Sequence, residues 1–265
     1  MCTVTFIAQK GGYCLGMNRD EKLTRPVGLA PQLKKVNGRA VVSPSEPGGG
    51  TWIALTDGGT CLALINWHSV AGRVARKAIS RGEVVNVVAT TDSAVLTEAA
   101  LHELPLCQIN PFRLVGVFPA TAEIVEWRWN LKKLVSKTHP WRAQQWISSG
   151  FDEPDAQRIR ARTFRQARRQ KSVGSLDWLR RLHRSHAPQC GPFSTCMHRV
   201  DAATVSYTEV SVSPRRAVMR YCSGTSCSCS SKSLLCIQLR SSQCSWLDRP
   251  ARAALERTSA RTHRR

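Results

Sequence analysis

The chain has 265 residues, of which 42% are hydrophobic, so it is predicted to be globular rather than disordered. No apolar run reaches the ~20 residues that span a bilayer, and no basic leader precedes a long apolar segment, so we expect a cytoplasmic protein with no membrane span or signal peptide. The net charge is +21, but few aromatic side chains lie among the arginines that follow residue 150. This favours basic surface helices and a basic tail over a nucleic-acid partner.

The first 67 residues predict two antiparallel hairpins. Residues 2–8 alternate like a strand, the glycines at 11–12 make a turn, and "YCLGMN" returns as a second strand. "TRPVGLAPQL" is predicted to be a proline-marked loop, and Gly48–Gly50 a tight turn before the strand "TWIALTD". "DGG" then turns the chain into the strand "TCLALINW", which gives antiparallel sheet rather than a βαβ repeat.

The middle of the chain predicts helices that alternate with strands. Residues 81–92 and 93–104 favour helix, and 112–135 favour a strand–turn–strand unit in which Trp127 and Trp129 have structural roles. A third helix is expected from 152 onward, capped by Asp152 or Asp155, and "SLDWLRRLHRSH" predicts a shorter amphipathic one. The segment 199–222 alternates like a final strand pair.

The predicted class is therefore α+β, with sheets covered by helices. We expect a single domain over 1–229. Residues 230–265 are expected to form a basic, poorly ordered tail, with one short helix over "RPARAALER".

The 11 cysteines are odd in number and irregularly spaced, which argues against a disulfide scaffold. Cys222, Cys227 and Cys229 lie close together but form no regular CxxC pair, so free thiols in a loop are favoured over a zinc site. The histidines lie at no metal-ligand spacing, and His183 and His186 are predicted to be surface residues. We therefore expect no metal and no cofactor.

Cys2 is the first candidate for a catalytic residue. Its small size favours removal of Met1, which would leave a cysteine with a free α-amine of pKa ~7.7–8.0. One residue would then supply both a thiol nucleophile and its base, as in N-terminal-nucleophile enzymes. The competing interpretation is that "MC" is an accident of composition in a cysteine-rich chain.

The polar run "NRDE" lies on the strand expected to pair with the strand that begins at Cys2. Such groups are costly to bury unless each finds a partner. Alternation places Asn18 and Asp20 on one face of this strand, and Arg19 and Glu21 on the other. Only one of these pairs can easily face the Cys2 thiol.

Several short motifs, in their order along the chain, resemble the NRDE family, whose eukaryotic members are called transport and Golgi organisation protein 2. They are "MCTVTF", "NRDE", "TRP", "GGGTWIAL", "LALIN", "SRGEVV" and, further on, "MHRVDAATVSYTEV". That family in turn resembles the choloylglycine hydrolase and penicillin V acylase group of N-terminal-nucleophile hydrolases. The resemblance implies a four-layer αββα sandwich of antiparallel sheets and cleavage of non-peptide amide bonds.

The resemblance also implies roles for residues. The Asn-x-Asp of the hydrolases matches Asn18 and Asp20, which favours this pair as the one that faces Cys2 and leaves Arg19 and Glu21 for the back of the sheet. The oxyanion asparagine matches Asn66. A late arginine near the nucleophile matches Arg199.

One position departs from the hydrolase pattern. A second oxyanion asparagine is expected where this chain has Ser148, Ser149 and Gly150. The predicted catalytic set is Cys2, Asn18, Arg19, Asp20, Asn66 and Arg199. The predicted substrate pocket adds Glu21, Trp52 and Ser149.

Two functional interpretations stay open, and with them the question of whether the chain is an enzyme. The first is a cysteine N-terminal-nucleophile hydrolase acting on a small-molecule amide or acyl bond. The second is a catalytically silent member of the same fold that binds or carries a small hydrophobic ligand, such as haem or a lipid. A basic nucleic-acid-binding protein is the third and least favoured class.

Overall fold

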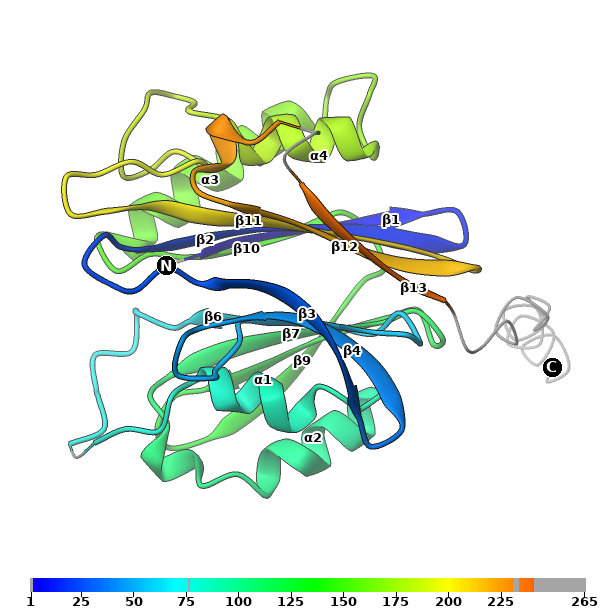
Figure 1. Cartoon of the computed structure of the whole chain (residues 1–265). Coiled ribbons are helices and arrows are strands. Elements are labelled where there is room, and N and C mark those ends of the chain that lie inside the picture. Colours follow the sequence, from blue (N-terminus) through cyan, green and yellow to red (C-terminus); the bar gives the residue numbers. More distant parts are fainter. Residues whose placement is uncertain (1, 76, 231–233, 241–265) are drawn as a thin grey trace, which may run out of the picture.

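The computed structural model describes residues 2–75, 77–230 and 234–240. Two antiparallel sheets pack face to face, and a pair of helices covers the outer face of each (Figure 1). The helices are α1 (Gly82–Val88), α2 (Ala94–His102), α3 (Glu153–Ala167) and α4 (Leu176–His183). The predicted α+β class and αββα layering are confirmed.

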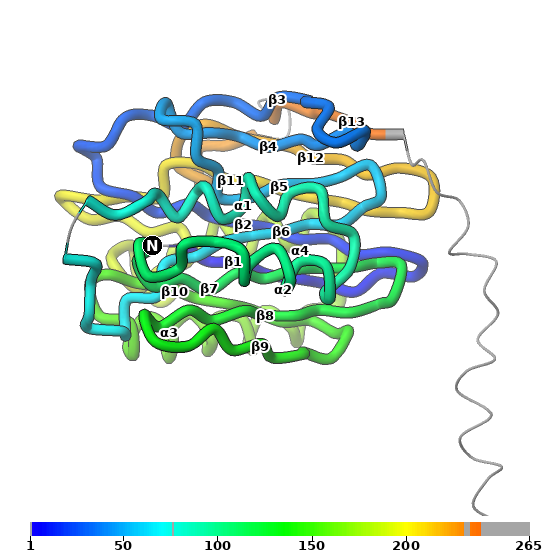
Figure 2. Tube along the Cα trace, turned by 90° about the horizontal axis from the view of Figure 1, so that it is seen from below, coloured from blue at the N-terminus to red at the C-terminus, as the bar shows by residue number. Residues whose placement is uncertain are grey.

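The first sheet has six strands, covered by α3 and α4. In spatial order they are β10 (Gln144–Ser148), β1 (Cys2–Gln9), β2 (Gly12–Lys22), β11 (Ala202–Ser213), β12 (Arg216–Ser223) and β13 (Leu235–Arg240). The second sheet has seven strands in chain order, and Figure 2 views it through α1 and α2. They are β3 (Leu29–Val36), β4 (Arg39–Ser45), β5 (Ile53–Thr56), β6 (Cys61–Asn66), β7 (Phe112–Phe118), β8 (Glu123–Trp129) and β9 (Leu134–His139).

The core lies between the two sheets, and the alternation of β1 and β2 decides which residues enter it. Val4 and Phe6 from β1, with Leu15 and Met17 from β2, are buried in this inter-sheet core. The opposite faces of the same strands pack against α3 and α4, where Cys14 belongs to a smaller apolar cluster. Even-numbered residues of β1 and odd-numbered residues of β2 therefore face the second sheet.

The expected hairpins, helices and final strand pair are confirmed, and the Asp152 carboxylate caps α3 by accepting a hydrogen bond from the backbone of Asp155 at 2.9 Å. The prediction of a loop over "TRPVGLAPQL" is wrong from Leu29 onward, because β3 begins there and contains Pro31. β3 lies at the edge of its sheet, where a strand tolerates a residue that cannot donate a backbone hydrogen bond.

The predicted tail, 230–265, contains a strand that the sequence did not reveal. β13 (Leu235–Arg240) pairs antiparallel with β12 and extends the first sheet. The helix predicted over "RPARAALER" lies outside the described residues. Among the residues that are described, no helix has the length and hydropathy needed to cross a membrane.

Helix α1, which covers the second sheet, begins in direct contact with the glycine turn at 48–50. A Cβ atom added to Gly82, the first residue of α1, would lie 2.6 Å from the Cα of Gly50 and 2.8 Å from the backbone N of Thr51. Backbone atoms cannot move aside cheaply, so this close approach depends on glycine at 82. It brings α1 against the segment that leads into β5.

We therefore predict that Gly82→Ala lowers the free energy of unfolding by ~1–3 kcal/mol, as overpacking does. The clash outweighs the ~0.5–1 kcal/mol that alanine usually gains over glycine in a helix. Gly48→Ala is the matched control, because nothing lies within 4 Å of an added Cβ there. Urea unfolding of both variants tests this, and equal stabilities would contradict it.

Candidate functional site

A cavity of about 310 Å³ opens at the end of the inter-sheet core where β1 begins. It falls at the lower end of the ~300–1,000 Å³ typical of small-molecule sites. Its lining is rich in charged and amide side chains. They are Arg19, Glu21, Arg25, Glu46, Asn66, Arg81 and Asn110, with Cys2 and Trp52 beside them.

Cys2 is the first residue of β1, and its side chain is 6% exposed. In the sheet it lies between Arg19 of β2 and Ser148 of β10, its partners in the two antiparallel registers. Burial raises the pKa of the Cys2 thiol, as does the Asp20 carboxylate, while the Arg19 guanidinium opposes the rise. A buried thiol of raised pKa is protonated at neutral pH, so it needs a base in order to attack a carbonyl.

Arg19 is held in place by a ring of ion pairs. Its Nη2 lies 2.7 Å from Oε1 of Glu46 and 3.6 Å from Oε2 of Glu21. Arg25 closes the ring, with Nη1 at 3.1 Å from Glu21 and Nη2 at 2.9 Å from Glu46. The Arg19 guanidinium also stacks over the Trp52 ring, 4.5 Å from the ring centroid. A positive charge is thus fixed beside the Cys2 thiol.

The "NRDE" run alternates between the two faces as expected, but the prediction that Asn18 and Asp20 are the pair that faces Cys2 is wrong. The side chains of Arg19 and Glu21 line the cavity with Cys2, whereas Asn18 and Asp20 point to the helix-covered face of the sheet. Residues directly opposite in an antiparallel pair share a face, and Cys2 lies opposite Arg19 rather than Asn18. The sequence could not give this one-residue choice, because it does not show where the hairpin register falls.

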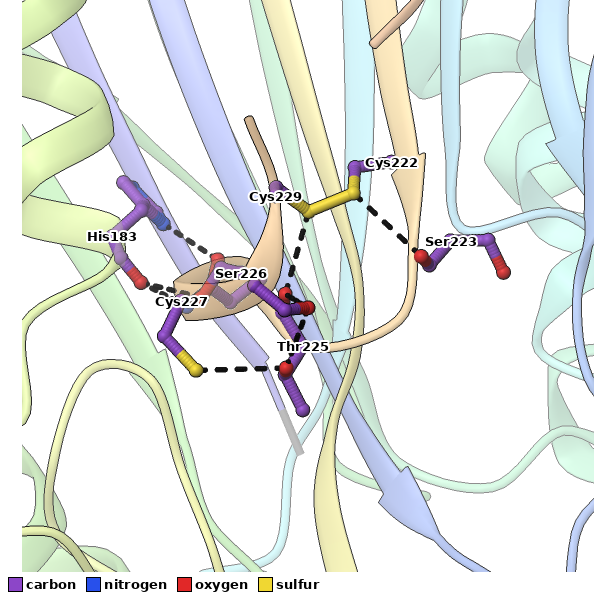
Figure 3. Close-up of a disulfide and its surroundings, with 9 residues drawn as sticks. His183, Cys222, Ser223, Thr225, Ser226, Cys227 and Cys229 are labelled. Carbon is purple, nitrogen blue, oxygen red and sulfur yellow. Dashed lines mark hydrogen bonds between the residues drawn. A yellow bond between two sulfur atoms is a disulfide. The ribbon is translucent and has the colours of Figure 1, made fainter. Parts of the chain in front are cut away.

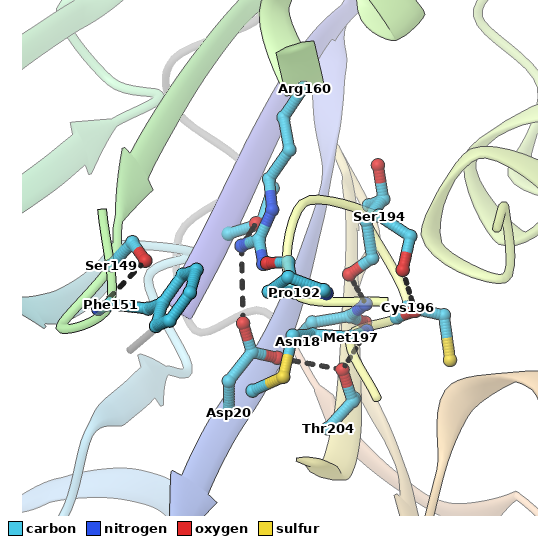
Figure 4. Close-up of polar contacts among 12 residues, drawn as sticks. Asn18, Asp20, Ser149, Phe151, Arg160, Pro192, Ser194, Cys196, Met197 and Thr204 are labelled. Atoms are coloured by element: carbon cyan, nitrogen blue, oxygen red, sulfur yellow. Dashed lines mark hydrogen bonds and ion pairs between the residues drawn. The ribbon is translucent and has the colours of Figure 1, made fainter. Parts of the chain in front are cut away.

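Asp20 is buried in a network on the helix-covered side of the sheet that contains Cys2 (Figure 4). Arg160 Nη1 donates to Oδ2 of Asp20 at 3.1 Å and to the Thr3 hydroxyl at 2.7 Å. The Thr204 hydroxyl donates to Oδ1 of Asp20 at 2.7 Å. Arg160 comes from α3, which was predicted to be a basic surface helix, yet its side chain is fully buried. No pattern in the sequence distinguishes Arg160 from the many other arginines.

Asn18 organises a second buried network with His183, the last residue of α4. The Asn18 amide donates to the backbone oxygens of His183 and Thr195 at 2.9 and 2.8 Å. The His183 ring bonds Asn18 Oδ1 through Nδ1 at 3.1 Å and Thr5 Oγ1 through Nε2 at 3.0 Å. Since Oδ1 can only accept, Nδ1 carries the proton. The prediction of a surface His183 is wrong: it is fully buried, and burial lowers its pKa to about 3.

The other predicted site residues divide into two groups. Asn66, at the end of β6, and Trp52 line the cavity with Cys2. Arg199 and Ser149 do not line it: Arg199 pairs with Asp201 at 2.8 Å, and the Ser149 hydroxyl accepts from the backbone of Phe151 at 3.3 Å.

Two buried donors beside Cys2 lack partners within the described part of the chain. They are the Ser148 hydroxyl, on the strand position opposite Cys2, and the indole N–H of Trp52. Unpaired buried donors are unusual in folded proteins, and at a cavity they can bind a ligand oxygen. Trp52 lines the cavity, whereas Ser148, like Ser149, does not, although Ser148 lies opposite Cys2 in the sheet. Arg25 and Arg81 also line the cavity; they lie in the motifs "TRP" and "SRGEVV", but no role was predicted for them. Glu46 and Asn110, which line it too, had no signal in the sequence.

The cysteine-rich segment after β12 is not a simple loop of free thiols. Cys222 and Cys229 form a disulfide, which corrects the prediction for these two residues, while Cys227 is free (Figure 3). The disulfide closes a short loop around the 3₁₀ turn η2 (Ser226–Ser228). Its Ser226 hydroxyl donates to the backbone oxygen of His183 at 2.7 Å.

Comparison with known protein families shows which family the chain belongs to. The model of the family "Transport and Golgi organisation 2" matches residues 1–157, which include β1, β2 and all of the residues that line the cavity. The chain belongs to this family. Among curated proteins, none matches it.

Solved structures show the same fold at low sequence identity. A mutant of conjugated bile acid hydrolase from Clostridium perfringens is 11% identical, with a TM-score of 0.52 over 89% of this chain and 92% of its own. A second variant of that hydrolase is 12% identical, with a TM-score of 0.54 over the same shares of both chains. Penicillin V acylase from Agrobacterium tumefaciens is 10% identical, with a TM-score of 0.52 over 84% and 83%. The family member described here therefore has the fold of these N-terminal-nucleophile hydrolases.

The role of Arg19 beside Cys2 can be tested by alkylation. Loss of the Arg19 charge should raise the pKa of the Cys2 thiol, because a neighbouring opposite charge typically lowers a thiol pKa by ~1–3. Less thiolate is then present, so Arg19→Gln should slow alkylation of Cys2 at pH 7 at least about tenfold. Peptide mapping by mass spectrometry separates Cys2 from the exposed cysteines. Arg25→Gln is the matched control, since Arg25 shares both carboxylate partners but is 44% exposed. Equal slowing in both variants would contradict a specific effect of Arg19.

The buried His183 predicts a pH dependence of stability. Its pKa is about 3 when folded, against ~6.5 when unfolded, so between these values the unfolded chain binds the extra proton. Stability should therefore rise with pH across this window, with a slope of up to ~1.4 kcal/mol per pH unit from this residue. Urea unfolding between pH 5 and 7 should show a shallower slope for His183→Gln, but not for the exposed His102→Gln. Parallel slopes for wild type and His183→Gln would refute this.

Proposed function

We propose that this protein is a cysteine N-terminal-nucleophile hydrolase that cleaves a non-peptide amide or related acyl bond of a small molecule. One observation carries the proposal: Cys2, at the start of β1, faces a cavity between the sheets together with Arg19 and Asn66. Family membership and the hydrolase fold support it. The proposal requires removal of Met1.

In the proposed reaction the α-amine of Cys2 takes the thiol proton, and the sulfur attacks the carbonyl carbon of the substrate. The negative charge that develops on the carbonyl oxygen is stabilised by the Asn66 amide, with Arg19 supplying positive potential. The C–N bond breaks, and the amine leaves with the proton. Water then hydrolyses the thioester, which releases the acyl group as a carboxylic acid and restores the Cys2 thiol.

The buried networks would position these groups without touching the substrate. Asp20, locked by Arg160 and Thr204, keeps a fixed carboxylate behind the strand pair that carries Cys2 and Arg19. Asn18 fixes the same strand to α4. Asn18 and Asp20 are thus proposed as positioning residues, and Arg199 is not included in the site.

The lining also favours a polar substrate over a purely apolar one. Three arginines and two glutamates border the cavity, which leaves an excess of positive charge. A lipid tail or a haem macrocycle would have to desolvate these groups, whereas an amide that carries a carboxylate could pair with Arg25 or Arg81.

Three measurements test the proposal. The intact mass of the purified chain should correspond to loss of Met1, and an electrophilic acyl probe should modify Cys2. Cys2→Ala should abolish turnover of a panel of small N-acyl compounds, whereas Cys107→Ser, at an exposed cysteine outside the cavity, should leave it unchanged.

Retention of Met1 would remove the mechanism outright. A chain that lacks Met1 and binds small hydrophobic ligands while Cys2 stays unmodified would instead favour the carrier interpretation. Turnover of N-acyl compounds that survives Cys2→Ala would contradict the role of Cys2 while leaving hydrolase activity in place.

A further inference from the structure

Four potential metal ligands converge at a point away from the Cys2 cavity. They are His186, Cys196, His198 and Cys227, and their ligand atoms all lie within 4.8 Å of one another. The sequence shows no metal-ligand spacing, because the four residues come from three separate stretches of the chain. Only folding brings them together.

The three distances from His198 to the other ligand atoms are those of a tetrahedral site. Nε2 of His198 lies 3.2 Å from Nε2 of His186, 3.4 Å from Sγ of Cys196 and 3.6 Å from Sγ of Cys227. Metal–ligand bonds of about 2.0 Å to nitrogen and 2.3 Å to sulfur, at tetrahedral angles, separate ligand atoms by about 3.3 Å for N–N and about 3.5 Å for N–S. The three edges at His198 therefore match this geometry to within about 0.1 Å.

We propose that these four side chains form a structural Zn²⁺ site. Two thiolates and two imidazoles in a tetrahedron are the donor set that zinc prefers, and four protein ligands leave no open position for substrate. On binding, each thiol releases its proton to solvent.

The backbone around the cluster is already fixed. The amide of Cys196 donates to the oxygen of Ser185 at 3.0 Å, and the amide of His198 donates to the oxygen of Gly191 at 3.2 Å. The Cys222–Cys229 disulfide closes the loop that carries Cys227 (Figure 3). Such preorganisation lowers the entropy that metal binding must overcome.

The location suggests what the metal does. The amide of Asn18 donates to the backbone of His183 and Thr195 and to the hydroxyl of Ser226, each within three residues of a zinc ligand. A metal bound by these three segments would fix the positions of the hydrogen-bond acceptors of Asn18. Zinc would thus stabilise the back of the sheet that carries Cys2, without taking part in the reaction.

The experiment loads the full-length protein with metal under anaerobic conditions. After gel filtration, elemental analysis should find about one zinc per chain. Co²⁺ in place of zinc should give the visible bands of tetrahedral cobalt and an ultraviolet thiolate-to-cobalt charge-transfer band. An octahedral cobalt spectrum without charge transfer, or sub-stoichiometric zinc, would overturn the proposal.

Variants assign the ligands. Loss of an outer-shell partner typically costs ~10–100-fold in metal affinity, so Cys196→Ser and Cys227→Ser should each weaken zinc binding at least about 100-fold. Cys190→Ser is the matched control, because this exposed cysteine lies in the same loop but outside the cluster. Equal affinities for Cys190→Ser and Cys196→Ser would refute the assigned site. The wild-type cobalt spectrum decides the matter even if a variant fails to fold.

Discussion

The end of β2 carries buried polar side chains on both faces of the sheet. The rest of the site depends on how these side chains find hydrogen-bond and ion-pair partners. Arg19 and Asp20 are adjacent in sequence, so the pleat sends their charges to opposite sides of one sheet. An unpaired buried charge costs several kcal/mol, so each side must supply a partner. Glu46 and the Trp52 ring meet Arg19 on the inter-sheet side, and Arg160 meets Asp20 on the helix side.

These partners tie distant parts of the chain to the strand beside Cys2. Arg160 brings in α3, His183 brings in α4, and Glu46 belongs to the turn that leads to β5. The result is a thiol held between rigid neighbours, with a fixed positive charge on its cavity side. Preorganised charge of this kind can stabilise an anionic transition state without reorganisation at the moment of reaction. The proposed zinc site of His and Cys ligands would likewise tie together the loops behind Asn18.

Strong local patterns predicted much of the fold. The first hairpin, the Asp152-capped helix and the final strand pair each show periodicity and turn residues that need no tertiary information. β3 was not predicted, because Pro31 suggested a loop. A proline is tolerated there only because β3 lies at the edge of its sheet. β10 escaped because "QQWIS" is short and half polar, although it supplies Ser148 opposite Cys2.

By itself the sequence determined the family, through the ordered motifs around Cys2 and "NRDE", and the antiparallel class, through its alternating hairpins. It also predicted a site of Cys2, Asn66, Trp52, Arg199, Ser149 and one of two residue pairs, of which Arg199 and Ser149 do not line the cavity. Only the tertiary structure decided which pair faces the cavity, because a shift of one residue in strand register reverses every side chain. Only the tertiary structure pairs Arg160 with Asp20. Likewise, only the tertiary structure brings together His186, Cys196, His198 and Cys227. Contacts between residues far apart in the chain depend on how helices and loops pack, and no local pattern encodes them.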